Sequence, residues 1–159
     1  MNQTYLLIGG NLGNREENLG RSRVHIATDI GKILRSSSIF ETEAWGKKDQ
    51  PPFLNQVLLI ETNSTVNKVL HQLLTIEERM GRKRMEKFGP RLIDIDILFF
   101  NNDIIHEPGL TVPHPHLHER RFTLEPLNEI APLMIHPVLK KTITELLESC
   151  PDPLAVKKL

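Results

Sequence analysis

The sequence predicts an α+β protein of the ferredoxin-like class, a β-α-β-β-α-β sandwich with an antiparallel sheet. One observation is the order of its apolar segments. Short runs rich in Val, Ile and Leu alternate with two longer segments of helical periodicity, as strand, helix, strand, strand, helix, strand. The other is the length of 159 residues, which suits one domain with its own core, so we expect residues 1–159 to form a single domain. An extra strand and C-terminal helices are expected to extend this unit.

The first strand and the first helix are separated by a glycine-rich turn. Residues Thr4–Ile8 are apolar, and the stretch 9–13 that stops them reads Gly-Gly-Asn-Leu-Gly. Asn14 can accept a hydrogen bond from the first turn of a helix, and acidic residues follow it where the helix dipole favours them. We expect this helix to reach about Ile30, with Gly31 as the residue that closes it.

The next two strands and the second helix are predicted from the same kinds of signal. Residues 32–40 are expected to form one strand and residues 53–62 another, with a long polar loop between them. Asn63 or Ser64 is expected to cap the second helix. The apolar residues of this helix recur at helical spacing until Gly81 ends it.

The fourth strand, Leu92–Phe100, carries two acids inside an apolar run. Asp94 and Asp96 are two residues apart, so a strand places them on one face, separated by about 6.6 Å along the chain. The isoleucines that alternate with them then point toward the helices. We expect this strand to lie inside the sheet rather than at its edge.

The elements predicted beyond this strand are short. A turn at residues 101–103 leads to a short strand near residues 104–105, after which two prolines break the chain. Residues 116–125 can be helical. Thr142 and Glu145 have the spacing of a capping box, which predicts the start of a last helix.

Composition narrows the classes of function. Lysine plus arginine and aspartate plus glutamate balance at 20 each, which argues against a general nucleic-acid or membrane-surface binder. Cys150 is the only cysteine, so no internal disulfide is possible and a reducing compartment fits. No apolar run has the length of a membrane span, and the N-terminus lacks the layout of a signal peptide. We therefore expect a cytoplasmic protein.

A basic stretch directly before the fourth strand suggests a role for its two acids. Residues 82–91 hold five basic residues against one acid. Carboxylates are ligands that Mg²⁺ prefers, and guanidinium groups bind the phosphate oxygens that the metal leaves unneutralised. The pattern therefore predicts a metal–polyphosphate site. The alternative is that Asp94 and Asp96 lie on a solvated strand face and that the basic stretch is an exposed turn.

The stretch Phe88–Leu98 resembles the signature of the 6-hydroxymethyl-7,8-dihydropterin pyrophosphokinase family, since it reads Phe-Gly-Pro-Arg-Leu-Ile-Asp-Ile-Asp-Ile-Leu. Further stretches resemble other motifs of that family in the same order along the chain: residues 9–13, 49–55, 110–115 and 119–122. The similarity extends to about Pro137. Several separated motifs in the right order are far more specific than any one of them.

The resemblance implies an enzyme of folate biosynthesis that transfers diphosphate from ATP to the hydroxymethyl group of 6-hydroxymethyl-7,8-dihydropterin and releases AMP. It implies that Asp94 and Asp96 hold two Mg²⁺ ions and are catalytic together with Arg82 and Arg91. The residues that it implies for ATP are Glu77, Arg82, Arg84, Arg91, Ile97, Thr111, His114 and Arg120. Those that it implies for the pterin are Thr42, Trp45, Gly46, Phe53, Asn55 and Phe122.

The pterin set combines rings with a polar edge. Phe53 and Phe122 would sandwich the flat pterin, and Asn55 would pair with its amide-like edge. Without the resemblance, both phenylalanines would be assigned to the core and Glu77 to an exposed helix surface. We expect the partners to be these small molecules, with neither nucleic acid nor membrane, and the protein to be a monomer.

The chain departs from the family at several positions, so the nucleotide contacts there stay open: Leu74, Lys87, Phe88 and Gly109. Two other classes of function are alternatives. An RNA-recognition module shares the β-α-β-β-α-β order, although its aromatic pattern is missing. A zinc hydrolase could use the histidines at 114, 116 and 118, although the neighbouring prolines disfavour a strand there.

Overall fold

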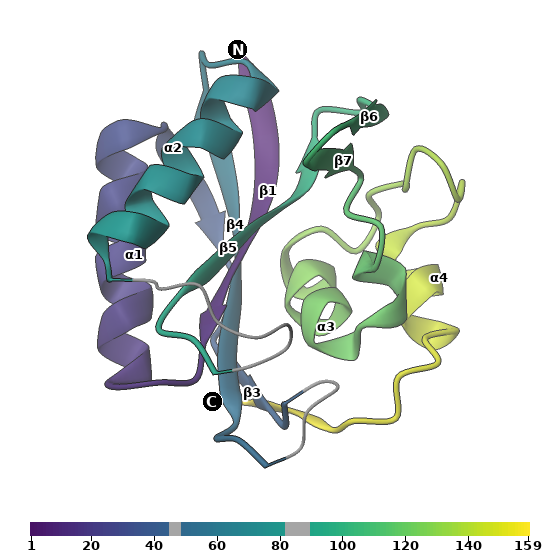
Figure 1. The fold of residues 1–159 in the computed structure, drawn as a ribbon. Coiled ribbons are helices and arrows are strands. Elements are labelled where there is room, and N and C mark those ends of the chain that lie inside the picture. The colour runs from purple at the N-terminus through teal and green to yellow at the C-terminus, as the bar shows by residue number, and fades with distance from the viewer. Residues whose placement is uncertain (45–48, 82–89) are drawn as a thin grey trace.

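The computed structural model describes residues 1–44, 49–81 and 90–159, and it shows a main antiparallel sheet between two layers of helices (Figure 1). The strands of this sheet follow the order β5-β1-β4-β3-β8, and β2 also pairs with β4. The elements of the first half are β1 (Asn2–Gly10), α1 (Arg15–Asp29), β2 (Lys32–Ser36), β3 (Phe40–Thr42), β4 (Phe53–Thr62) and α2 (Val66–Arg79). Those of the second half are β5 (Asp94–Phe100), β6 (Ile105–Glu107), β7 (Leu110–Val112), the 3₁₀ turn η1 (Leu117–Glu119), α3 (Arg121–Ile130), α4 (Ile143–Glu148) and β8 (Val156–Lys158).

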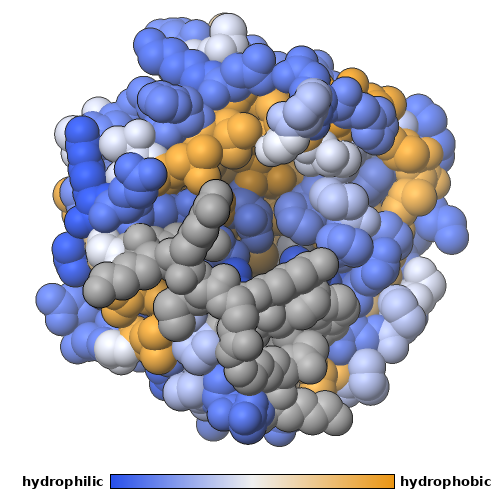
Figure 2. All heavy atoms as spheres, viewed as in Figure 1, coloured by the Kyte–Doolittle hydropathy of each residue, from blue (hydrophilic) through white to orange (hydrophobic). Residues whose placement is uncertain are grey.

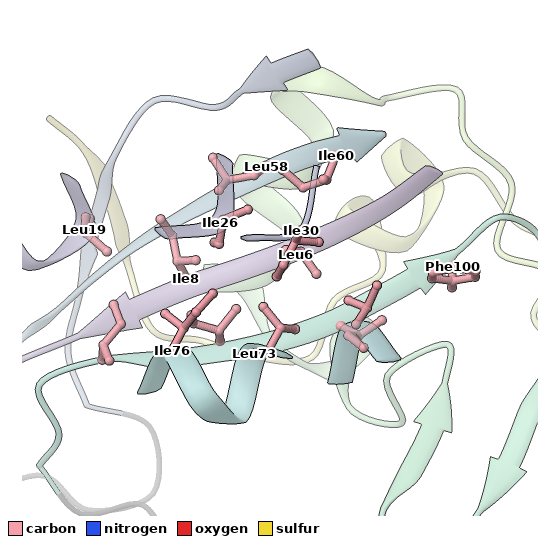
Figure 3. Packing of buried hydrophobic residues seen from close by; sticks show 14 of the residues in the cluster. Leu6, Ile8, Leu19, Ile26, Ile30, Leu58, Ile60, Leu73, Ile76 and Phe100 are labelled. Carbon is pink, nitrogen blue, oxygen red and sulfur yellow. The ribbon is translucent and has the colours of Figure 1, made fainter. Parts of the chain in front are cut away.

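The two faces of the sheet are buried against different helices. Leu6 and Ile8 of β1 pack with α1 and α2 in one apolar cluster, beside Leu73 and Ile76 of α2 (Figure 3). Leu7, the residue between them, belongs to a second cluster with residues of α3 and α4. Because side chains alternate along a strand, both clusters draw on the same strands. This arrangement confirms the predicted ferredoxin-like class.

Helix α1 starts and ends where the sequence predicts. Gly31, which follows it, is needed because a side chain would not fit there, and not because the backbone is left-handed. The side chain of Asn14 accepts a hydrogen bond from the N–H of Glu17 at 3.1 Å, as predicted for a cap. Gly31 has no positive φ. A Cβ at Gly31 would lie 2.0 Å from the carbonyl oxygen of Glu61, so only glycine allows the chain to pass β4 this closely.

Two predictions for the middle of the chain are wrong. The single strand expected over residues 32–40 is divided into β2 and β3, because the chain leaves the regular ladder at Ser37. The hydroxyl of Ser37 accepts the N–H of Val57, and the N–H of Ser37 donates to the carbonyl of Val57. The cap of α2 is Thr65 rather than Asn63 or Ser64. The hydroxyl of Thr65 accepts a hydrogen bond from the N–H of Lys68 at 3.3 Å.

The acid-bearing strand β5 lies at the end of the sheet, so the prediction of an inner strand is wrong. Among the described strands β5 pairs with β1 alone in this sheet, which is the position that the order of the strands gives to the last strand of the unit. The prediction for its isoleucines is confirmed, since Ile93, Ile95 and Ile97 all lie in the cluster under α1 and α2.

A β-bulge after the two aspartates changes which residues of β5 point to each face of the sheet. Leu6 of β1 is opposite Ile97, but Tyr5 is opposite Phe99, so Leu98 is an extra residue. Leu98 and Phe99 therefore both belong to the cluster under α3, while Phe100 returns to the other side. The bulge lets β5 fill both clusters beyond its two aspartates.

The C-terminal elements match the prediction only in part. The capping box of Thr142 and Glu145 at the start of α4 is confirmed. The helix expected over residues 116–125 starts only at Arg121, because the extended backbone of Arg120 separates it from the turn η1. Strand β7, which forms a hairpin with β6, and strand β8 are absent from the prediction. Within the described ranges, no helix is long and apolar enough to span a membrane.

Candidate active site

Four strands form one row across the sheet, on the face that α3 covers, and two of them contribute a polar side chain to it. Asp94 of β5 is opposite Gly9 of β1, Gly9 is opposite Asn55 of β4, and Asn55 is opposite Phe40 of β3. Gly9 leaves room for its neighbour, since a Cβ there would lie 2.1 Å from Oδ1 of Asn55. Asp96 follows two residues after Asp94 and therefore projects from the same face.

Arg91 connects Asp94 with the aromatic residue at the start of β4. Its guanidinium Nη1 is 3.0 Å from Oδ2 of Asp94, and the same group lies 6.0 Å from the centre of the Phe53 ring. Both side chains of the ion pair are partly exposed. The predicted phosphate ligand therefore lies between a predicted metal ligand and a predicted pterin residue.

Asn11 holds this arrangement together, and sequence reasoning missed its role. Its Oδ1 accepts the N–H of Arg91 at 2.9 Å, and its own N–H donates to the Arg91 carbonyl at 3.0 Å. Its Nδ2 donates to Oε1 of Gln50 and to the carbonyl of Pro51, both at 2.9 Å. The side chain is buried at 3% exposure. Its position inside the glycine-rich stretch 9–13 is the signal that could have found it.

Glu77 is buried rather than exposed on its helix. Its residue exposure is 3%, and its Oε2 accepts the backbone N–H of Ile95 at 2.8 Å. Ile95 lies between Asp94 and Asp96, so the carboxylate of Glu77 anchors the backbone that carries both acids. The alternative of an exposed helix acid is wrong.

His114 and Arg120 approach the acids from the segment after β7. The N–H of His114 donates to the carbonyl of Leu98 at 3.0 Å, and its Nδ1 accepts the N–H of His116 at 3.1 Å. Burial, the charge of Arg120 and the charge of His116 together lower the pKa of His114 to about 4. His114 is therefore neutral at pH 7, with its proton on Nε2, where it can donate one hydrogen bond.

The guanidinium of Arg120 interacts electrostatically with both Asp94 and Asp96. Burial lowers the pKa of its guanidinium, and the carboxylates of Asp96 and Asp94 act in the opposite direction. The guanidinium also lies 5.7 Å from the centre of the Phe122 ring. Near the centre of Figure 2, where Figure 1 draws β5 and α3, the surface is hollowed and hydrophilic side chains border the hollow.

The phenylalanines of the pterin set are not central core residues. Phe53 is half-buried beside Arg91, and Phe122 is half-buried at the margin of the cluster under α3. Thr42 is opposite Phe53 in the β3–β4 pair, and its hydroxyl donates to the carbonyl of Ala155 at 3.1 Å. Phe53 belongs to neither apolar cluster, whereas Phe122 packs against the cluster under α3.

Comparison with known proteins identifies the family. The model of the family described as 7,8-dihydro-6-hydroxymethylpterin-pyrophosphokinase (HPPK) matches residues 5–132. The chain belongs to this pyrophosphokinase family. The 2-amino-4-hydroxy-6-hydroxymethyldihydropteridine pyrophosphokinase of Aquifex aeolicus is 37% identical over 145 residues, which are 91% of this chain and 90% of that protein. The enzyme of the same name from Methylorubrum extorquens is 34% identical over 160 residues, with 100% and 99% covered.

Some relatives of this pyrophosphokinase are much longer proteins. The folic acid synthesis protein fol1 of Pneumocystis carinii is 35% identical, and the match covers 93% of this chain but 20% of that protein. Among solved structures, wild-type HPPK-DHPS of Plasmodium falciparum with pteroate has a TM-score of 0.72 at 18% identity, over 92% of this chain and 44% of that one. At that identity the likeness supports the fold alone.

The remaining residues of the predicted pyrophosphokinase site, and the four positions whose nucleotide contacts stayed open, are placed as follows. The side chain of Ile97 lies in the cluster under α1 and α2. Thr111 is half-buried on β7, Gly109 has a φ of +79° in the hairpin turn, and Leu74 is exposed on α2. The predicted residues Trp45, Gly46, Arg82 and Arg84, and the open positions Lys87 and Phe88, lie outside the described residues.

The acids suit magnesium better than zinc. In the described part of the chain, no group of three or more His, Cys, Asp or Glu could hold a metal by itself, so the zinc hydrolase built on three histidines is not supported. Two carboxylates on one strand face fit Mg²⁺, which takes its other ligands from phosphate and water. Membership of the pyrophosphokinase family also favours an enzyme over an RNA-recognition module.

Proposed function

We propose that this pyrophosphokinase transfers the terminal diphosphate of ATP to the hydroxymethyl group of 6-hydroxymethyl-7,8-dihydropterin and releases AMP, with two Mg²⁺ ions. The observation that carries the proposal is the position of Arg91. Its guanidinium is paired with Asp94 on one side and lies over Phe53 on the other, so a phosphate bound there would be next to a flat ring stacked on Phe53. The names of the curated relatives support the same pair of substrates.

The acids and the arginines would divide the charge of the triphosphate between them. Asp94 and Asp96 would hold the ions, which when bound supply charge neutralisation and lower the pKa of the attacking alcohol. Arg91 would exchange part of its contact with Asp94 for phosphate oxygens, together with Arg82, Arg84 and Arg120. No side chain has to remove a proton, because positioning and electrostatics supply most of the catalysis of phosphoryl transfer.

His114 and the pterin residues would set the geometry of the two substrates. As a neutral imidazole, His114 would donate one hydrogen bond to a phosphate oxygen without adding charge. Phe53 and Phe122 would stack on the two faces of the pterin, and Asn55 would both donate to and accept from its edge. Backbone groups from Thr42 to Gly46 would complete that edge.

We further propose that the 159 residues act as a single domain, as a monomer in the cytoplasm and in folate biosynthesis. The balanced charge of the sequence supports small molecules, rather than nucleic acid or a membrane, as its partners. Size-exclusion chromatography with light scattering of the purified chain tests the monomer. A dimer at micromolar concentration would contradict it.

The activity is tested by incubating the protein with ATP, Mg²⁺ and 6-hydroxymethyl-7,8-dihydropterin. We expect one AMP for each pterin diphosphate, and no AMP without the pterin or with EDTA. ADP formed in place of AMP would contradict diphosphate transfer. Titration of Mn²⁺ with a non-hydrolysable ATP analogue, followed by electron paramagnetic resonance, should give two bound ions per chain, and one ion would contradict the two-metal arrangement.

Asp96→Ala is the matching variant. We expect it to lower kcat by about 100-fold or more, because it removes a group that stabilises charge in the transition state. The fold should persist, since Asp96 is only partly buried and is not part of either apolar cluster. Asp103→Ala, in the exposed turn after β5, is the control and should turn over at the parental rate.

A further inference from the structure

The first turn of α3 is held by a carboxylate from the far end of the chain. Arg120 occupies the cap position of this helix, and its side chain makes no capping hydrogen bond. Instead, Oδ2 of Asp152 accepts the N–H of Arg121 at 3.1 Å, while its Oδ1 accepts the N–H of Leu154 at 3.0 Å. Asp152 is 5% exposed. A buried anion at a helix N-terminus stabilises that end of the helix.

The side chain of Arg121 makes the connection reciprocal. Its Nε donates to the carbonyl of Asp152 at 3.2 Å, and its Nη2 donates to the carbonyl of Cys150 at 3.4 Å. The start of α3 and residues 150–154 are therefore bonded in both directions. Arg120 and Phe122, the residues on either side of Arg121, are the ones proposed for phosphate and pterin.

The same segment continues to the opposite side of the pterin site. After Leu154, the carbonyl of Ala155 accepts the hydroxyl of Thr42, and Val156 of β8 pairs with Thr42 of β3. Figure 1 shows this segment, in yellow, returning from α4 to the strand edge at β3. Since Thr42 is directly opposite Phe53, one short stretch of chain is bonded next to both proposed stacking rings.

We propose that Asp152 is a positioning residue for the pterin. It holds the first turn of α3 so that Phe122 and Arg120 keep a fixed place relative to Thr42 and Phe53. This inference rests on the proposed function, and Asp152 is not among the residues proposed to contact either substrate. It predicts that loss of the carboxylate weakens binding of the pterin more than binding of ATP, because most proposed ATP residues lie on other segments.

The rest of α3 is anchored independently of Asp152. Leu124 and Leu127 are fully buried in the cluster under this helix, and Glu129 near its end is 2.8 Å from Nζ of Lys158. A variant at Asp152 should therefore free the first turn without detaching the helix. This separation allows a positioning role to be distinguished from general loss of structure.

The test compares KM values in the purified full chain. Asp152→Ala should raise KM for 6-hydroxymethyl-7,8-dihydropterin by about 10-fold, the usual effect of losing a good helix cap, with KM for ATP and kcat within about threefold of the parent. Asp152→Asn keeps one of the two acceptor oxygens and loses the charge, so it should raise KM for the pterin less than Asp152→Ala does. Lys158→Ala removes the ion pair between the same C-terminal segment and Glu129, near the other end of α3. This variant should leave both KM values unchanged.

The outcomes separate this inference from the proposed function. If the parent chain forms no AMP with the pterin, the proposed function fails and the inference fails with it. If the parent is active and Asp152→Ala changes neither KM, or changes both equally, the inference alone is overturned. If Asp152→Ala does not give the parental circular dichroism spectrum, Arg121→Gln replaces it, because it removes the reciprocal hydrogen bonds. For Arg121→Gln, a pterin KM raised by about threefold or more relative to the KM for ATP supports the inference, and any smaller difference between the two overturns it.

Discussion

Arg91 shows how one side chain can belong to two parts of a site. Its backbone is clamped by Asn11, its guanidinium pairs with Asp94, and the same group covers the Phe53 ring. A planar guanidinium can do this because it forms hydrogen bonds in its plane and stacks with its face. An ammonium group has no such face.

Arg91→Lys should therefore lower kcat although the positive charge is kept. We expect a loss of about 100-fold, because a lysine cannot bind two phosphate oxygens in a fork and stack on Phe53 at the same time. Steady-state kinetics with both substrates measures it. Arg79→Lys, on an exposed residue of α2 that pairs with Asp29, is the matched control. Equal activity of the two variants would contradict the proposed role of Arg91.

For single residues, the sequence indicates the chemistry of the site but not the hydrogen-bond partners of each side chain. The alternation around Asp94 and Asp96 predicts their shared face, because a strand has a fixed period. The three partners of the Asn11 side chain come from residues about 40 and 80 positions away, and no local pattern contains them. The same holds for Glu77, whose partner Ile95 becomes its neighbour only when α2 packs on β5.

Among the elements, those with a strong internal period are predictable and those that depend on a partner are not. Helices α1 and α2 and strands β1, β4 and β5 each carry enough apolar residues to be found in the sequence. Strand β8 is only Val156–Lys158 and becomes a strand because β3 offers it an edge. The break between β2 and β3 likewise depends on Ser37 meeting β4, which the sequence does not reveal.

Two glycines, one inside α1 and one between α1 and β2, should respond in opposite ways to alanine. Gly31→Ala should destabilise the protein by about 2–3 kcal/mol, because its Cβ would press on the carbonyl of Glu61 and force the backbone apart. Gly20 lies inside α1, and the nearest atom to its Cβ would be the flexible end of Arg23 at 3.5 Å. Gly20→Ala should stabilise the protein by about 0.5–1 kcal/mol.

Urea denaturation of both variants measures these free energies of unfolding. The two substitutions add the same methyl group, so each controls for the other. Destabilisation by Gly20→Ala, or an unchanged midpoint for Gly31→Ala, would contradict the packing described for that position.

For the whole molecule, stability should fall in mild acid because of a buried histidine. Nδ1 of His136 accepts the N–H groups of Val138 and Leu139, and the residue is 4% exposed. Burial, helped by the charge of His118, lowers its pKa to about 4 from an ordinary 6.5. The unfolded chain binds this proton more readily, so the stabilisation is complete above pH 6.5 and is lost as the pH falls toward 4.

The loss should amount to about 3 kcal/mol in the free energy of unfolding between pH 7 and pH 4. His136→Asn offers a similar acceptor without a proton to gain, so its stability should change less over this range. Denaturation at a series of pH values measures both curves. His114 shifts in the same direction in both proteins, so only the difference between the curves reports on His136. Parallel curves would contradict the assignment.

The sheet ends at β5, and an unpaired strand edge can recruit a strand from another copy of the chain. Here the edge is already engaged, since Glu77 takes the N–H of Ile95 and His114 donates to the carbonyl of Leu98. An incoming strand would have to displace a buried carboxylate to pair with Ile95. The contacts that align the acid-bearing strand thus also act as a safeguard against amyloid-like growth from the side of the molecule where its substrates are proposed to bind.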